Sequence, residues 1–230
     1  MKYSISFILL LIITSCETSL TEIDTSKAPK IQVIDTDFSK GKLSLVQGIH
    51  LDDVALFHGH LCDGLVVGYL GLNEALQDLY PNGIVDRTNT RIISNSSPCL
   101  TDVAIYVTGG RYQFNSFYVD DKIDGFYHVQ RMDTEQSIRV DLKPDVKPKA
   151  IDSLGRLAIQ QKLNACELAE LKKLEDNFSH FLLTHPVNDV FEIQVMKNFN
   201  WQPKPKNDYM KSDIINKNSS CCNTTDSTLN

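Results

Sequence analysis

The sequence predicts a single α+β domain in which helices pack against a mixed or antiparallel sheet. Three observations lead to this prediction: an apolar helical segment with spaced glycines after residue 63, alternating strand patterns between residues 126 and 142, and a long amphipathic pattern from residue 165. The length of 230 residues fits one generous domain or two small ones, and we find no internal repeat. We therefore expect one folded domain over residues 41–200.

Residues 1–16 have the pattern of an export signal and are set aside from the fold. A positive start at Lys2, an apolar run over residues 5–13 that is too short for a permanent span, and small residues before Cys16 fit this pattern. It resembles a bacterial lipoprotein signal, in which Cys16 would be lipidated; the alternative is a plain secretory signal cut nearby. We expect an exported protein, lipid-anchored to a bacterial membrane and facing the periplasm or the cell surface.

Polar segments flank the expected domain. Residues 17–40 are rich in Thr, Ser, Asp and Lys, with a short apolar run at 31–34, and predict a tether with at most one strand. Residues 201–230 predict a flexible polar tail.

Export would allow the cysteines to form disulfides, because the compartment outside the cytoplasm is oxidising. Five remain besides Cys16, an odd number, so at least one is free, bound to metal or paired with another chain. The adjacent Cys221 and Cys222 cannot easily bridge each other.

In the first half of the domain, the sequence pattern predicts helices before and after one strand. From residue 43 the pattern becomes helical, and a helix over 51–57 should stop at Gly59. Asp63 is a suitable N-cap for a central helix over residues 64–80, in which three glycines on one face would let another backbone approach closely: Gly64, Gly68 and Gly71. A strand over 91–95 and a helix over 100–107 follow.

The second half predicts a hairpin, a long helix and a last strand. Residues 126–131 and 137–142 should pair as the hairpin. Asn164 and Glu167 form a predicted capping box on a helix that ends at His185 and Pro186, before a strand at 191–195.

The formal net charge of −6 argues against a nucleic-acid partner, because phosphate neutralisation needs a basic surface and no stripe of Lys and Arg is visible. Short lysine-rich segments, such as 143–149, are expected to be solvated loops. The sequence identifies no small-molecule substrate.

A metal site is predicted around the run FHGHLCDG at residues 57–64, which places two histidines and a cysteine within five residues. A second cysteine, Cys99, is expected at a helix N-terminus, where amide donors and the helix dipole favour the thiolate. Nitrogen and sulfur ligands suit a transition metal, with zinc the first expectation and nickel or copper as alternatives.

The candidate ligands are Cys62, Cys99 and His60, with His60 the favoured imidazole; the alternative for the cysteines is a role as small buried hydrophobes. His58 is either a further ligand or a group that orients His60 by a hydrogen bond. Asp102 is either a carboxylate that supports a ligand or an ordinary acid at a helix start. The other histidines, among them His128, are expected to be surface or cap residues, and Cys166 is expected in the core.

The runs at 57–76, 91–109 and 182–193 resemble the FmdE-like domain family, which is associated with formylmethanofuran dehydrogenase, and the likeness covers residues 43–196. The resemblance implies an α+β domain that tends to form homodimers, with a cleft lined by the His-x-Cys motif and the second cysteine. It implies no established reaction.

The chain departs from the family pattern in three places. Asp63 stands where the family usually has proline, and Gly110 stands where a further cysteine commonly follows Thr108 and Gly109. The C-terminal zinc ribbon of many members is missing, since Cys221 and Cys222 cannot close one.

Three functions fit these residues. The first is an accessory or carrier role for a bound metal. The second is an enzyme whose metal keeps an open position and activates water, with Asp102 or His58 as proton carrier. The third is thiol redox chemistry between Cys62 and Cys99.

Overall fold

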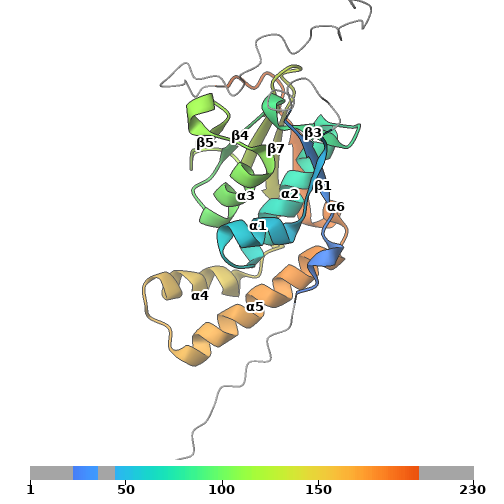
Figure 1. Cartoon of the computed structure of the whole chain (residues 1–230). Helices are drawn as coiled ribbons and strands as arrows, with labels where there is room; N and C mark the ends of the chain where they lie inside the picture. The colour runs from blue at the N-terminus through green and yellow to red at the C-terminus, as the bar shows by residue number, and fades with distance from the viewer. Residues whose placement is uncertain (1–22, 36–44, 202–230) are drawn as a thin grey trace, which may run out of the picture.

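A computed structural model describes residues 23–35 and 45–201. The predicted signal with Cys16 and the predicted tail from residue 202, with Cys221 and Cys222, lie outside the described residues. Within the described ranges, no helix is long and apolar enough to cross a membrane. The α+β fold class is confirmed (Figure 1).

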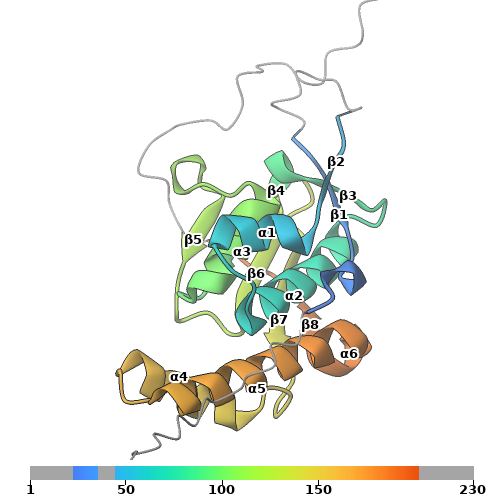
Figure 2. The ribbon, with the colours of Figure 1, turned by 60° about the horizontal axis from the view of Figure 1, so that its bottom comes forward.

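The larger sheet has five strands in the order β5-β4-β6-β7-β8. The strands β4 and β5 are parallel and the other neighbours antiparallel, so the sheet is mixed, as predicted. The helices α2 and α3 cover one face of this sheet (Figures 1 and 2). The bounds are β4 Thr90–Ser94, β5 Phe117–Val119, β6 Tyr127–Arg131, β7 Ser137–Leu142, β8 Phe191–Val195, α2 Asp63–Leu79 and α3 Pro98–Thr108.

The predicted hairpin is confirmed as β6 and β7, in which Val129 pairs with Ile138 and Tyr127 with Val140. All four of these side chains are fully buried against the helices. The alternation seen in the sequence therefore marks the face of the sheet that helices cover.

Part of the segment predicted as a tether with at most one strand is folded. Residues 31–34 form β1 (Ile31–Ile34), which pairs with β2 (Gln47–Ile49) and β3 (Ile84–Asp86) in a second sheet. Ile31 and Val33 are buried in the same core as α2. The residues of β2, which we expected to begin a helical region, form a strand instead.

The central helix α2 is buried over most of its circumference, as its apolar composition predicts. Cys62, rather than Asp63, occupies the N-cap position. The predicted close approach at the glycines comes from side chains, not from another backbone. A Cβ on Gly68 would lie 2.8 Å from Tyr127 Oη, and one on Gly71 would lie 2.8 Å from Phe126 Cζ.

The remaining helices are α1 and a group that follows β7. The helix α1 (Leu51–His58) stops at Gly59, whose φ of 101° is left-handed, as glycine permits. Two long helices, α4 (Lys149–Ile159) and α5 (Ala165–Thr184), form an arm on one side of the sheets (Figures 1 and 2). The short α6 (Val187–Val190) and three 3-10 turns complete the fold: Thr25–Lys27, Arg87–Asn89 and Tyr112–Phe114.

The arm bears out one expectation and overturns another. The capping box forms, with the amide of Asn164 donating to Glu167 Oε2 at 2.8 Å and the amide of Glu167 donating to Asn164 Oδ1 at 3.0 Å. Cys166, which we expected in the core, is exposed on the first turn of α5. The first turn of α5 extends away from the two sheets, so the sheets do not cover the Cys166 side chain.

We expect Gly71→Ala to destabilise the fold by about 1–3 kcal/mol, because the new methyl group would overlap buried aromatic and aliphatic side chains. The matched control is Gly155→Ala on α4, where a Cβ meets nothing within 4 Å. It should raise stability by about 0.5–1 kcal/mol through helix propensity. Denaturant unfolding measures both changes, and an equal effect of the two substitutions would contradict this packing.

Candidate metal centre

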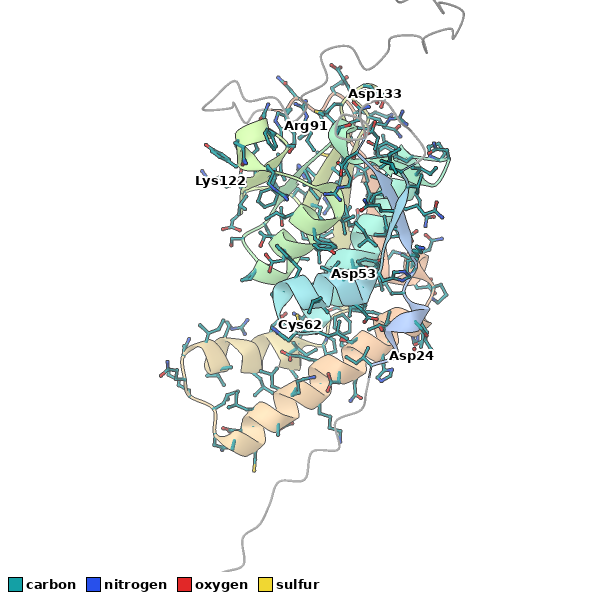
Figure 3. All side chains as sticks on the ribbon, in the orientation of Figure 1. Asp24, Asp53, Cys62, Arg91, Lys122 and Asp133 are labelled. Carbon is teal, nitrogen blue, oxygen red and sulfur yellow. The ribbon has the colours of Figure 1, made fainter. Side chains whose placement is uncertain are left out.

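The candidate site lies where the turn between α1 and α2 meets the start of α3. Cys62 is at the beginning of α2, between α1 and the arm (Figure 3). His58 is the last residue of α1, and Cys99 is in the first turn of α3. Three helix ends therefore supply the three side chains.

The two thiols predicted from the sequence meet. Cys62 Sγ lies 3.3 Å from Cys99 Sγ, and Cys99 Sγ lies 3.8 Å from His58 Nε2. One ligand atom from each of these residues falls within 4.8 Å of the others, which makes the three side chains a group that could hold a metal ion. In the described part of the chain, no other such group of His, Cys, Asp and Glu occurs.

Gly64 allows this approach of α2 and α3. A Cβ at Gly64 would lie only 2.9 Å from both Cβ and Sγ of Cys99. The glycine therefore makes room for the second thiol beside the first. The spacing of glycines along α2 was visible in the sequence, but the partner of Gly64 was not.

Asp102 orients His58. The carboxylate Oδ2 lies 2.7 Å from His58 Nδ1, and the side chain of His58 is only 8% exposed. In the neutral imidazole, an Nδ1–H that donates to this carboxylate leaves the lone pair on Nε2, which faces Cys99. In the protonated ring, Nε2 instead carries a hydrogen and places positive charge next to Cys99. Asp102 thus fixes which imidazole nitrogen is available as a ligand, a common arrangement around metal-binding histidines.

The favoured imidazole of the sequence analysis was His60, and here the structure differs. His60 is exposed and lies outside the group of three, although its ring centroid is 4.7 Å from that of His58. The left-handed turn at Gly59 ends α1 and separates the two histidines. Only His58 remains on the helix, opposite Asp102.

The two thiols share one proton unequally. A hydrogen bond from Cys62, followed by the charge of His58, lowers the pKa of Cys99 to about 6 against the opposing effect of burial. The same hydrogen bond, together with burial, raises the pKa of Cys62 far above its ordinary value. Near neutral pH, Cys62 is therefore the S–H donor and Cys99 the thiolate acceptor.

A lysine that we expected in a solvated loop reaches this site. Lys147 Nζ lies 3.6 Å from Asp63 Oδ2 and 3.1 Å from Asp152 Oδ1. Asp63 is buried, and its charge next to Cys62 is balanced by this lysine. Burial and the charge of Asp63 raise the pKa of Glu175 on α5. The departure at Asp63 was the sequence signal for this cluster, but its partner lay more than eighty residues away.

His128 is also placed differently from our expectation of a surface position. It is buried, and its Nε2 lies 2.8 Å from the carbonyl oxygen of Asp124. It lies on β6, away from the three candidate ligands, and packs edge-on against Phe199.

Comparison with known families identifies the family of the chain. The family model described as "FmdE, Molybdenum formylmethanofuran dehydrogenase operon" matches residues 57–192, more than half of the chain. The chain belongs to the FmdE family. The matched FmdE segment contains His58, Cys62, Cys99 and Asp102, and it confirms the resemblance seen in the sequence. No functionally curated protein matches the chain.

In the reduced, metal-free FmdE domain, we expect the alkylation rate of Cys99 by iodoacetamide to rise with pH around a midpoint of about 6. The thiolate is the nucleophile, and a lowered pKa means that it persists down to this pH and is lost below it. Brief labelling at each pH, followed by peptide mass spectrometry, isolates Cys99 from the other cysteines.

Cys62→Ala removes the hydrogen-bond donor and should move the Cys99 midpoint upward, toward the ordinary thiol value of about 8.5. The exposed Cys166 serves as an internal reference whose profile should not change. A Cys99 midpoint that is the same with and without Cys62 would contradict the shared proton.

Proposed function

We propose that this chain is an exported, lipid-anchored FmdE domain that binds one transition-metal ion, zinc in the first place, in an accessory or carrier role. The observation that carries the proposal is the convergence of one imidazole and two thiols, with ligand atoms within 4.8 Å of one another. We propose His58, Cys62 and Cys99 as the ligands.

The chemistry of the donor set supports a borderline metal. Two sulfur atoms and one imidazole nitrogen are ligands of zinc, and of nickel or copper, rather than of magnesium or calcium. Ligands bound to one ion at about 2.0–2.3 Å must lie within about 4.6 Å of each other, and the separations of 3.3 and 3.8 Å meet this condition. The low pKa of Cys99 supplies one thiolate before any metal binds.

The rest of the chain prepares the ligands. Asp102 holds Nδ1 of His58 and thereby presents Nε2. Lys147 neutralises the carboxylate of Asp63, which limits the negative charge that builds up beside two thiolates. Three protein ligands leave a coordination position for water or a partner's group, and a bound metal there would act as a Lewis acid. This feature keeps a metal-dependent enzyme as an alternative.

A second candidate function is thiol redox chemistry, and the 3.3 Å separation of the two sulfur atoms favours it. Loss of two protons and two electrons to a disulfide oxidant would join Cys62 and Cys99. A thiolate at Cys99 would attack the oxidant, and Cys62 would then resolve the mixed disulfide. Metal content separates this candidate from the first.

The location and assembly rest on separate support. The signal pattern before Cys16 supports export and lipidation. The homodimer is proposed from what the family resemblance implies.

We expect purified protein to carry about one zinc, nickel or copper ion per chain, and to lose it in Cys62→Ala, Cys99→Ala and His58→Ala. Elemental analysis of anaerobically purified protein measures the content. His60→Ala and Cys166→Ala are the matched controls, because both residues are exposed and lie outside the ligand group. Asp102→Asn should retain the ion with an affinity lower by about 10- to 100-fold.

Metal content that survives loss of both thiols would overturn the proposed centre. Protein without metal in which the two cysteines become labelled only after reduction would instead favour the redox function.

Cys16→Ser should abolish incorporation of a radiolabelled fatty acid in a bacterial host and release the protein from the membrane fraction. Cys166→Ser is the control and should leave labelling unchanged. A membrane-bound, labelled Cys16→Ser protein would rule out lipidation at this residue.

A further inference from the structure

A pocket separate from the candidate metal centre lies beside the contact of α1 with α3. It is a separate space of about 630 Å³, which is within the range of small-molecule sites. None of the three candidate metal ligands lines it. Its walls come from β2, α1, α3 and two loop arginines: Gln47, Gly48, Ile49, Asp53, Phe57, Arg87, Ile105, Tyr106 and Arg111.

Two guanidinium groups line the pocket. Arg87 comes from the turn after β3, and Arg111 from the segment after α3. Burial lowers the pKa of Arg87, the carboxylate of Asp35 opposes this, and the charge of Arg111 lowers it further. Both cations line the same pocket, and their like charges repel each other. A bound anion would relieve this repulsion.

Arg87 is held firmly in its place. Its Nε lies 3.6 Å from Asp35 Oδ2, and its guanidinium lies against Gly109, where a Cβ would come within 2.5 Å of Nη2. Gly109 caps the C-terminus of α3 with a left-handed φ of 62°, so the cation also faces the negative end of the helix dipole. These contacts fix the position of the Arg87 guanidinium before any ligand binds.

Arg111 is the more accessible cation. It is exposed, and its Nη1 donates to the carbonyl oxygen of Gly110 at 2.8 Å. Within the described ranges, no carboxylate forms a salt bridge with Arg111. The acid that lines the pocket, Asp53, accepts the amide of His50 at 2.8 Å and caps α1. Four of the five donors of Arg111 remain for a ligand.

Two aromatic side chains, Phe57 and Tyr106, also line the pocket. The ring centroids of Phe57 and Tyr106 are 5.4 Å apart and the planes are tilted by 42°. Phe57 is 51% exposed although it is large and apolar. The exposed Phe57 and the half-buried Tyr106 line the same pocket as the two guanidinium groups, and they provide contacts for a flat, apolar ligand body.

We propose that this pocket binds a small organic anion, whose carboxylate or phosphate group is held by Arg111 and Arg87 and whose flat apolar body lies on Phe57 and Tyr106. Arg suits this role because its planar fork matches an oxyanion in two hydrogen bonds. The proposal does not depend on a metal at the Cys62 and Cys99 site.

Calorimetric titration of the protein from residue 17 onward with two isosteric probes tests the proposal. Naphthalene-2-carboxylate carries the anion, and naphthalene-2-carboxamide has the same shape without the charge. We expect the carboxylate to bind at least roughly tenfold more tightly than the amide, as loss of a charge-assisted hydrogen-bond pair implies. Arg111→Gln should abolish this preference, and Arg156→Gln on the exposed face of α4 should preserve it.

Tyr106→Leu provides a second, independent readout. Because Tyr106 contacts the apolar body, its loss should weaken both probes by a similar factor and leave their ratio unchanged. Thermal unfolding of each variant verifies that it is folded. Equal binding of the two probes to the unaltered protein, or a charge preference that persists in folded Arg111→Gln, would overturn the proposal.

Discussion

The close contact between the starts of α2 and α3 is the constraint on which the rest of the site depends. Gly64 has no side chain, and the space that a Cβ would fill is taken by Cys99. Any larger residue at position 64 would move the thiol of Cys99 away from Cys62. Because interiors are close-packed, such a change could not be absorbed by empty space nearby. The 3.3 Å separation of the sulfur atoms requires this close approach.

Once the sulfur atoms are adjacent, electrostatics sets their protonation. A thiolate is costly in a half-buried site unless a donor and a positive environment stabilise it. Here the S–H of Cys62 donates to Cys99, and the protonated form of His58 adds positive charge. Asp102 then holds the imidazole from its other side. The ligand set is therefore organised by hydrogen bonds between its own members and one supporting carboxylate.

Both the arm and the pocket are joined to the helices that carry the candidate ligands. Lys147, just before α4, ties the arm to Asp63 and so to the start of α2. The helix α1 carries the candidate ligand His58 directly after Phe57 of the pocket, and α3 carries the candidate ligand Cys99 seven residues before Tyr106 of the pocket. Two helices thus serve both regions, which explains why short segments of sequence carry several kinds of side chain in succession.

The sequence by itself determined the fold class, the hairpin, the capped helix of the arm, the family and the two thiols. Local periodicity, capping residues and a dense motif predict these features, and each of these signals acts over a few residues. Only the tertiary structure decided that His58 and not His60 faces the thiols, that residues 31–34 belong to a second sheet, and that Lys147 and Asp63 are partners. Each of these outcomes depends on contacts between segments far apart in the chain, or on the direction that the chain takes after a turn such as the one at Gly59. Local patterns carry no information on such distances, because they are set by how whole elements pack.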